Sequence, residues 1–294
     1  MVVGATQATG HLRVRILVTG AGGQVGHELV EAFADHDVVA ATHSDLDVSD
    51  RDAVIEAVRA SNPNVILHAA AWTAVDACEG DPDRAFAVNA LGTRHVAEAA
   101  GRVNARVCYF STDYVFDGTK NEPYTEADDP NPQSVYGQSK LAGEREVARQ
   151  RDALIVRLSW VCGFHGQNMV KTILRLAGEH DKLQFVDDQR GRPTFADDAA
   201  ATVRQLIDNR RTGIFHVTNG GAVSWYEFAR SVMESAGLDP DRVHPIATAD
   251  LQPARPAPRP ANSVLENAAL RQAGLPPLPP YRESLDRLVA RLIT

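Results

Sequence analysis

From residue 13 onward, short runs of β-branched and other apolar residues alternate with longer segments of helical periodicity. The apolar runs predict strands at 14–18, 38–42, 65–67, 106–110 and 154–158. The segments between them predict helices at about 24–34, 51–60, 93–103 and 134–150, each ended by polar residues, glycine or proline. This alternation is typical of βαβ units around a parallel sheet covered on both faces. We therefore predict an α/β fold with a Rossmann-type, doubly wound parallel sheet.

The pattern is less regular after Trp160. It predicts helices near 168–177, 196–208 and 225–236 and a short strand at 214–217. Ser224 can cap the last of these helices, with Glu227 as its capping-box partner. The prolines clustered in 253–260 and in 276–280 predict extended connections.

This change in pattern suggests two lobes. We expect a dinucleotide-binding domain over 13–158 and a smaller C-terminal α/β substrate lobe made mainly of 159–195 and 219–294. The segment 196–218 is expected to pack back on the first domain. Residues 1–12 are expected to form a loose N-terminal tail.

The composition of the chain argues against several classes of function. The chain has 38 acidic and 30 basic residues and no Lys/Arg-rich tract, so it lacks the positive surface that a nucleic-acid partner requires. Cys78, Cys108 and Cys162 lie far apart with no CxxC spacing, which predicts neither disulfides nor a metal site and favours a cytoplasmic location. No apolar run is long enough to span a bilayer, no secretory signal begins the chain, and no membrane partner is expected. The motifs of common hydrolases and NTPases are absent from the sequence.

A glycine-rich turn follows the first predicted strand directly. The sequence TGAGGQVG places Gly20, Gly23 and Gly26 in a GxxGxxG spacing at the entrance to a helix. Glycines there allow a sharp turn, a close approach of backbone amides to a pyrophosphate, and tight packing of the helix on the strand. The alternative is a tight turn without a ligand. The placement between strand and helix favours a dinucleotide site.

The end of the second predicted strand bears on the choice of cofactor. Dinucleotide folds often carry a carboxylate there that binds the ribose 2′-hydroxyl and repels a 2′-phosphate. Here the residues are Ala41, Thr42, His43 and Ser44. This favours NADPH, with His43 or Ser44 against its phosphate, and leaves NADH open. Asp47 can accept a hydrogen bond from the adenine, because Ser49 or Asp50 is the better N-cap for the next helix.

Tyr136 and Lys140 lie four residues apart at the start of a long helix, so they share one face. A nearby ammonium is expected to lower the tyrosine pKa and make the phenol a better acid–base catalyst. Ser111 and Thr112 end the strand that precedes this helix, at the edge where ligands bind in such sheets. Either hydroxyl can hold a substrate oxygen on these grounds.

The chain thus contains TGAGGQVG, HAAA after the third predicted strand, and YGQSK. With these motifs it resembles the extended short-chain dehydrogenase/reductases. A narrower resemblance, to the dTDP-4-dehydrorhamnose reductase family, rests on GGQVGHEL, LDVSD, AAAWTAVDACE, STDYVFDG, VRLSWVCGFHGQNMVKTILRLA, DQRGRPT, GIFHVTNGGAVSWYEFA and RPANSVLEN, in the family's order. It implies NAD(P)H-dependent reduction of the C4 ketone of dTDP-4-dehydro-L-rhamnose to dTDP-L-rhamnose. A homodimer is left open.

The resemblance also implies roles for individual residues. Tyr136 protonates the forming alkoxide, Thr112 rather than Ser111 binds the same oxygen, and Lys140 contacts the nicotinamide ribose. The remaining cofactor residues are Gly20, Gly23, Gln24, Val25, Gly26, His43, Asp47, Val48, Ala69, Ala70, Ala71 and Thr73. The implied substrate residues, besides Thr112, are Asp113, Val115, Phe116, Trp160, Asn168 and Arg192.

Some features depart from the family pattern. Trp72 and Cys162 stand where tyrosines are usual. The carboxylate cluster that binds a metal between subunits in some relatives is not recognisable here. Two alternatives to the implied reaction stay open. One is a reductase or epimerase acting on another 4-keto-6-deoxy nucleotide sugar, such as one giving a 6-deoxytalose product. The other is a non-catalytic NADP-binding subunit like that of methionine adenosyltransferase.

Overall fold

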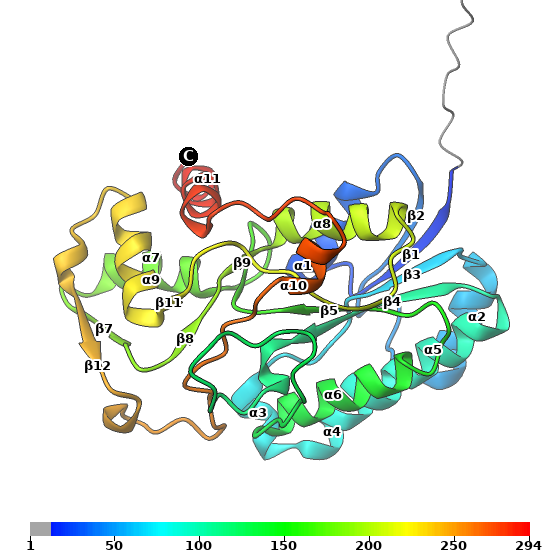
Figure 1. Cartoon of the computed structure of the whole chain (residues 1–294), viewed down its shortest axis with the longest axis horizontal. Helices are drawn as coiled ribbons and strands as arrows, with labels where there is room; N and C mark the ends of the chain where they lie inside the picture. Colours follow the sequence, from blue (N-terminus) through cyan, green and yellow to red (C-terminus); the bar gives the residue numbers. More distant parts are fainter. Residues whose placement is uncertain (1–12) are drawn as a thin grey trace, which may run out of the picture.

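The computed structural model describes residues 13–294, so the predicted tail at 1–12 lies outside the described residues. Six parallel strands form the main sheet in the order β10-β5-β4-β3-β1-β2 (Figure 1). They are β1 (Arg15–Thr19), β2 (Asp37–Ala41), β3 (Val65–His68), β4 (Arg106–Thr112), β5 (Leu154–Leu158) and β10 (Gly213–His216). The predicted Rossmann-type parallel sheet is confirmed.

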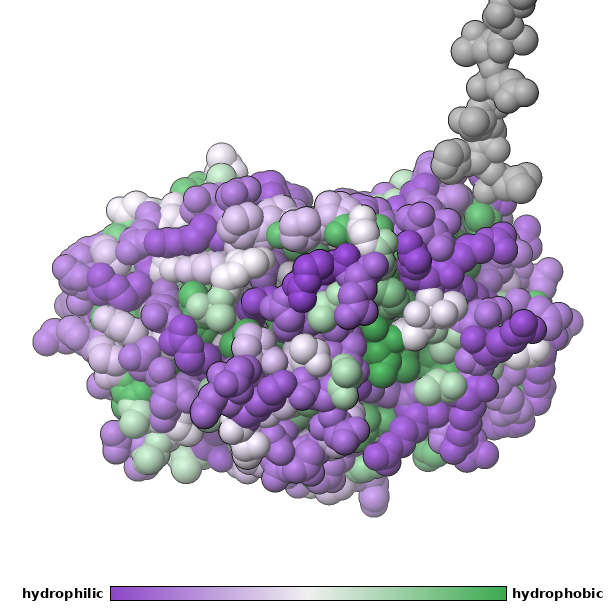
Figure 2. Space-filling model, viewed as in Figure 1, coloured by the Kyte–Doolittle hydropathy of each residue, from purple (hydrophilic) through white to green (hydrophobic). Residues whose placement is uncertain are grey.

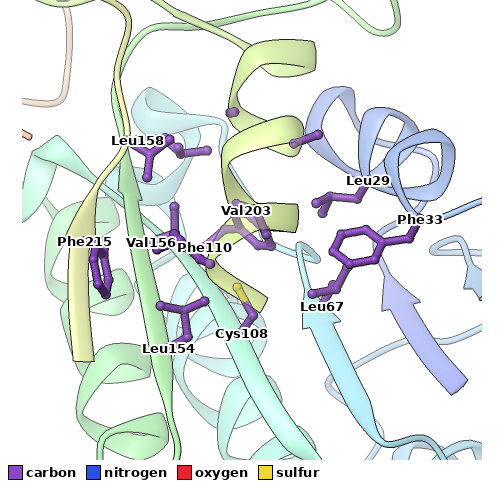
Figure 3. Close-up of a cluster of buried hydrophobic side chains, with 14 of the residues drawn as sticks. Leu29, Phe33, Leu67, Cys108, Phe110, Leu154, Val156, Leu158, Val203 and Phe215 are labelled. Atoms are coloured by element: carbon purple, nitrogen blue, oxygen red, sulfur yellow. The ribbon is translucent and has the colours of Figure 1, made fainter. Parts of the chain in front are cut away.

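Helices cover both faces of this sheet. On one face lie α1 (Gln24–Ala32) and α8 (Ala196–Asp208), and on the other lie α2 (Arg51–Ser61), α5 (Gly92–Arg102) and α6 (Val135–Val147). Figure 3 shows the first interface, where Leu29, Phe33 and Val203 pack on strand side chains. Successive strand residues point to opposite faces, and because helices cover both faces, the middle of each strand is apolar.

Between β3 and α5 the structure contains short helices that the sequence pattern does not predict. These are α3 (Val75–Gly80), α4 (Pro82–Phe86) and a π-helical turn (Ala87–Leu91) that continues into α5. After β4, a 3₁₀ turn (Asp113–Val115) leads toward α6. A helix of five or six residues has too few positions for its periodicity to be recognised.

The C-terminal half contributes a second lobe with its own apolar core. Its capping box at Ser224 and Glu227 is confirmed. Its helices are α7 (Met169–Glu179), α9 (Trp225–Ser235) and α11 (Tyr281–Ile293), with 3₁₀ turns at Pro240–Arg242 and Thr248–Asp250. Its strands are β6 (Val161–Cys162), β7 (Leu183–Val186), β8 (Arg190–Gly191), β9 (Thr194–Phe195), β11 (Val223–Ser224) and β12 (Val243–Ile246).

Three segments from this half return to the main sheet, among them the short helix α10 (Ala268–Gln272), whose Leu270 joins the core beneath β10. Strand β10 extends the sheet beside β5, and α8 packs against α1. The proline-rich segment reaches the short helix α3, where Arg259 forms an ion pair with Asp76. No helix within residues 13–294 is long and apolar enough to cross a membrane. In Figure 2 hydrophilic residues dominate the visible face, with hydrophobic ones in small groups.

Candidate active site

Two cavities meet at the carboxyl ends of the main-sheet strands. One, of about 410 Å³, extends from the glycine turn to Tyr136 and Trp160. The other, of about 420 Å³, extends from the same turn to the end of β2. Both are lined by Gly23, Ala69 and Ala71. A larger cavity of about 560 Å³ opens at the amino-terminal edge of the sheet and contains none of the predicted site residues.

The glycine turn has the geometry of an anion cradle. Gly20 has a φ of 70°, in the left-handed region that favours glycine. A Cβ on Gly26 would lie 2.2 Å from the carbonyl oxygen of Gly20, so only glycine fits there. Helix α1 begins after Gly23 with no side-chain cap and no acidic residue in its first turn. Its first N–H groups are therefore available to a pyrophosphate, and the residues present fit a dinucleotide.

The second cavity fits the adenosine half of such a cofactor. It is lined by His43, Asp47 and Val48, as the sequence predicts, together with Thr42 and Ser44. Asp50, and not Asp47, caps helix α2, which confirms the sequence-based choice. The Asp47 carboxylate accepts hydrogen bonds from the backbone N–H and hydroxyl of Ser49 at 2.9 and 2.7 Å, and these bonds lower its pKa.

The first cavity brings Thr112, Tyr136 and Lys140 together. The Tyr136 side chain is largely buried, and its ring meets that of Tyr114 edge-on at 5.6 Å. Burial raises the pKa of Tyr136 well above its usual value, and a hydrogen bond with Thr112 opposes this rise. The phenol is therefore protonated at neutral pH and can act as an acid.

The position of Lys140 differs from the sequence expectation. Its Nζ donates to the carbonyl oxygen of Phe110 at 2.7 Å and lies 4.2 Å from the centre of the Tyr109 ring. Burial lowers the pKa of Lys140 to about 7, opposed by the charge of Glu144. The sequence predicts that Lys140 makes Tyr136 more acidic; in this structure burial is the largest influence on the pKa of Tyr136 and raises it.

Of the predicted substrate residues, Thr112, Asp113 and Trp160 line the cavity. Burial raises the pKa of Asp113 to about 6, and its Oδ2 has no hydrogen-bond partner within the described chain. Val115 and Phe116 do not line the cavity. Their placement in the site is wrong, because both side chains turn into a buried cluster with Tyr124, Leu141 and Leu265.

Asn168 and Arg192 also lie outside the cavity lining. Asn168 caps helix α7, and its side-chain amide donates to Gln24 Oε1 at 3.0 Å. It therefore reaches the site only through Gln24. Arg192 forms an ion pair with Glu266 at 3.1 Å. These contacts give both residues structural partners, although the Nε of Arg192 is buried without a hydrogen-bond partner in the described residues.

The structure adds residues that the sequence argument leaves out. Ser111, which the resemblance sets aside in favour of Thr112, lines the cavity with a buried hydroxyl that has no partner in the described chain. Tyr114 and Trp225 also line it. The position of Tyr114 in STDYVF is the one local signal that could have identified it, whereas nothing near Trp225 in the sequence indicates its position. Within residues 13–294, no three His, Cys, Asp or Glu side chains group as metal ligands would.

Comparison with known proteins assigns this geometry to a family. Residues 14–294 match the family model described as RmlD substrate binding domain. A dTDP-4-dehydrorhamnose reductase of Mycolicibacterium smegmatis is 42% identical over 95% of this chain and 86% of its own length. A dTDP-4-keto-6-deoxy-D-glucose reductase of Streptomyces niveus is 38% identical over 93% of this chain and 96% of its own. The solved structure of dTDP-4-dehydrorhamnose reductase from Bacillus anthracis in complex with NADP superposes with a TM-score of 0.91 at 36% identity, covering 95% of this chain and all of that one.

Proposed function

The chain belongs to the RmlD family, and from this premise we propose that it reduces the C4 ketone of dTDP-4-dehydro-L-rhamnose to the alcohol of dTDP-L-rhamnose. NADPH is the proposed reductant. In the balanced reaction, C4 gains a hydride, the C4 oxygen gains a proton, and oxidised cofactor is released. The reaction belongs to nucleotide-sugar biosynthesis.

The cofactor is assigned to the two cavities that share the glycine turn. Gly20, Gly23 and Gly26 would hold the pyrophosphate against the N-terminus of α1. Asp47 and Val48 would hold the adenine, and the residues Ala69, Ala71 and Thr73 the nicotinamide side. When bound, the reduced nicotinamide supplies the hydride. The absence of a carboxylate from the last residues of β2 supports NADPH.

Tyr136 is the proposed proton donor. Its buried phenol keeps its proton at neutral pH, and Thr112 lies beside it on the same cavity wall. The hydroxyl of Thr112 would bind the ketone oxygen while the phenol passes its proton to the forming alkoxide. Lys140 would contribute positive charge and a hydrogen bond to the cofactor ribose. Its bond to the Phe110 carbonyl already fixes the direction of the amine.

The observation that carries this proposal is the meeting of Thr112, Tyr136 and Lys140 in a cavity that reaches the glycine turn. The test supplies purified protein and NADPH with dTDP-4-keto-L-rhamnose and follows absorbance at the nicotinamide band. We expect NADPH oxidation and a product with the NMR couplings of rhamnose. Absence of oxidation would remove the catalytic assignment and favour the NADP-binding regulatory subunit.

A different C4 stereochemistry is the second candidate. The Streptomyces niveus relative carries the name of a reductase for another 4-keto-6-deoxy sugar, which supports testing a second ketosugar. A product with the couplings of 6-deoxytalose would identify this alternative. The same NMR experiment, run over a panel of nucleotide ketosugars, separates the two.

Location and assembly form part of the proposal. We assign the protein to the cytoplasm, where its three buried cysteines would stay reduced and its nucleotide-sugar substrate would be made. Cell fractionation tests this location. Light scattering on the purified protein decides between monomer and homodimer.

A further inference from the structure

Two tryptophans form the second-lobe wall of the cavity that contains Tyr136. Trp160 and Trp225 stack with ring centroids 3.5 Å apart and planes 7° from parallel. Phe228 packs against them at 6.4 and 6.0 Å, with its plane steeply inclined to both. Both indoles line the cavity. The cavity that contains Tyr136 is therefore lined by an aromatic pair against which a third ring packs.

Three separate segments hold this pair. Trp160 lies between β5 and β6 with a φ of 47°, a left-handed conformation that is costly for a side chain of this size. Its carbonyl accepts a hydrogen bond from the Thr194 N–H at 3.3 Å. Trp225 directly follows β11, which pairs with β8 and so brings Gly191 beside the indoles. Strain that persists at a cavity wall points to a role for the strained residue.

Gly191 packs closely against the indole of Trp160. A Cβ at Gly191 would lie 2.4 Å from Cε2 and 2.6 Å from Nε1 of Trp160. The Gly191 backbone thus packs directly on one indole, while Trp225 covers a face of the same ring. Trp225 lines the cavity as well, so its indole is also open to a ligand.

We propose that Trp225 is the residue that selects a sugar with a methyl group at C5 over one with a hydroxymethyl group, and that Trp160 is its positioning residue. This inference rests on the proposed function. The indole face is apolar, and Leu158 and Val161 extend the apolar wall beside it. The hydroxyl of Ser159, also on this wall, already donates to the Arg192 carbonyl. A sugar 6-hydroxyl would lose water here and gain no partner, whereas a methyl group packs favourably.

The expected discrimination is moderate. An apolar pocket binds a ligand that carries one additional hydroxyl about 10- to 100-fold more weakly. The test measures, by calorimetry on the NADP⁺-loaded protein, the binding of two dTDP-sugars that differ only in a methyl or hydroxymethyl group at C5. We expect the wild type to prefer the methyl sugar by this factor. Trp225→Ala should reduce the preference below about 3-fold.

Two further variants distinguish a loss of sugar selectivity from a loss of the fold. Tyr226→Ala removes the neighbouring aromatic ring of α9, which does not line the cavity, and should keep the full preference. Gly191→Ala should displace Trp160 and lower the preference although Trp225 is still present. The same variant should lose the exciton signal that two stacked indoles give in circular dichroism.

The ratio of the two sugar affinities decides the outcome, because a merely structural role of Trp225 would weaken the binding of both sugars equally. An unchanged ratio in Trp225→Ala overturns the proposal, as does a wild type that binds both sugars alike. Turnover of the ketosugar by the wild type is measured separately. A protein that keeps the binding preference but oxidises no NADPH contradicts the proposed reaction and leaves the selecting role of Trp225 in place.

Discussion

Lys140 Nζ donates a hydrogen bond to the carbonyl oxygen of Phe110 at 2.7 Å, which ties helix α6 to strand β4. Both ends of this bond are buried, and the Tyr109 ring lies beneath the amine. Burial lowers the pKa of Lys140 to about 7. The proposed active site therefore contains an amine that changes charge near neutral pH.

The first prediction concerns the pH dependence of activity. As pH rises through about 7, Lys140 loses its proton and with it the charge that holds the cofactor, so kcat/KM should fall on the alkaline side. In Lys140→Arg the charge persists, because a guanidinium keeps its proton throughout this range. That variant should turn over more slowly, but its kcat/KM should not fall on the alkaline side. Initial rates of NADPH oxidation between pH 5.5 and 9 measure both profiles, and a flat wild-type profile would contradict the assignment.

The second prediction concerns the proton donor. Tyr136→Phe removes the hydroxyl and keeps the ring that packs on Tyr114, so the fold and cofactor affinity should be unchanged. The value of kcat should fall by about 100-fold or more, the scale of a lost general acid. Tyr226→Phe is the matched control on a tyrosine outside the cavity lining. Equal turnover in Tyr136→Phe and the wild type would assign proton donation to another group.

Local pattern accounts for much of this fold. The strands at 38–42 and 154–158 and the helices at 51–60 and 196–208 lie within one residue of their observed limits. Each has a complete apolar face or run and a clear break at its ends. The glycine turn was recognisable for the same reason, because its spacing has to follow a strand and open a helix.

Contacts between distant segments were not predictable. Phe116 and Trp160 are both aromatic residues that follow a strand, yet Phe116 packs into a buried cluster and Trp160 lines the cavity. Trp225 meets Trp160 only because β11 pairs with β8. The pKa of Tyr136 depends on how completely the folded chain removes water from its phenol, and sequence spacing carries no information on that.

The third prediction tests the phosphate cradle. Gly26→Ala places a Cβ 2.2 Å from the Gly20 carbonyl oxygen, so the turn has to open and NADPH affinity should fall by at least 10-fold. Gly101→Ala is the control, because a Cβ there meets nothing within 4 Å on helix α5. It should leave the affinity intact and stabilise the fold by about 0.5–1 kcal/mol. Titration of NADPH fluorescence measures both affinities. Equal binding by the two variants would rule out the close-approach argument.

The fourth prediction concerns the buried ion pair between Glu144 of α6 and Arg157 of β5. Two hydrogen bonds of 2.8 and 2.7 Å join the side chains, which are 5% and 1% exposed. Glu144→Gln leaves the guanidinium charge unpaired in the core, which should cost about 3–5 kcal/mol of unfolding free energy. Replacing both residues, with Glu144→Leu and Arg157→Met, should recover most of that loss. Urea unfolding measures each variant, and a single substitution that costs under about 1 kcal/mol would show that water reaches the pair.

The fifth prediction concerns stability in acid and depends on His68. The ring is fully buried, with its nitrogens 2.7 and 3.1 Å from the hydroxyls of Thr19 and Thr93. Burial, assisted by the charge of Lys140, lowers the pKa of His68 to about 3. The unfolded chain takes up this proton near pH 6.5, so between the two values it binds more protons than the folded chain does. The contribution of His68 to stability is therefore complete above pH 6.5 and declines as pH falls toward 3.

At about 1.4 kcal/mol per pH unit for one proton, this contribution should shrink by about 2 kcal/mol between pH 6.5 and 4.5. The measurement compares the unfolding free energies of the wild type and His68→Asn at these two pH values. His216, whose pKa is also lowered by burial, is present in both proteins and cancels in the difference. The gap between the two proteins should narrow by about 2 kcal/mol at the lower pH. A gap that stays constant would mean that His68 takes up its proton at much the same pH in the folded protein as in the unfolded chain. The charged imidazole ring would then be accommodated between its two threonine partners at no cost in free energy.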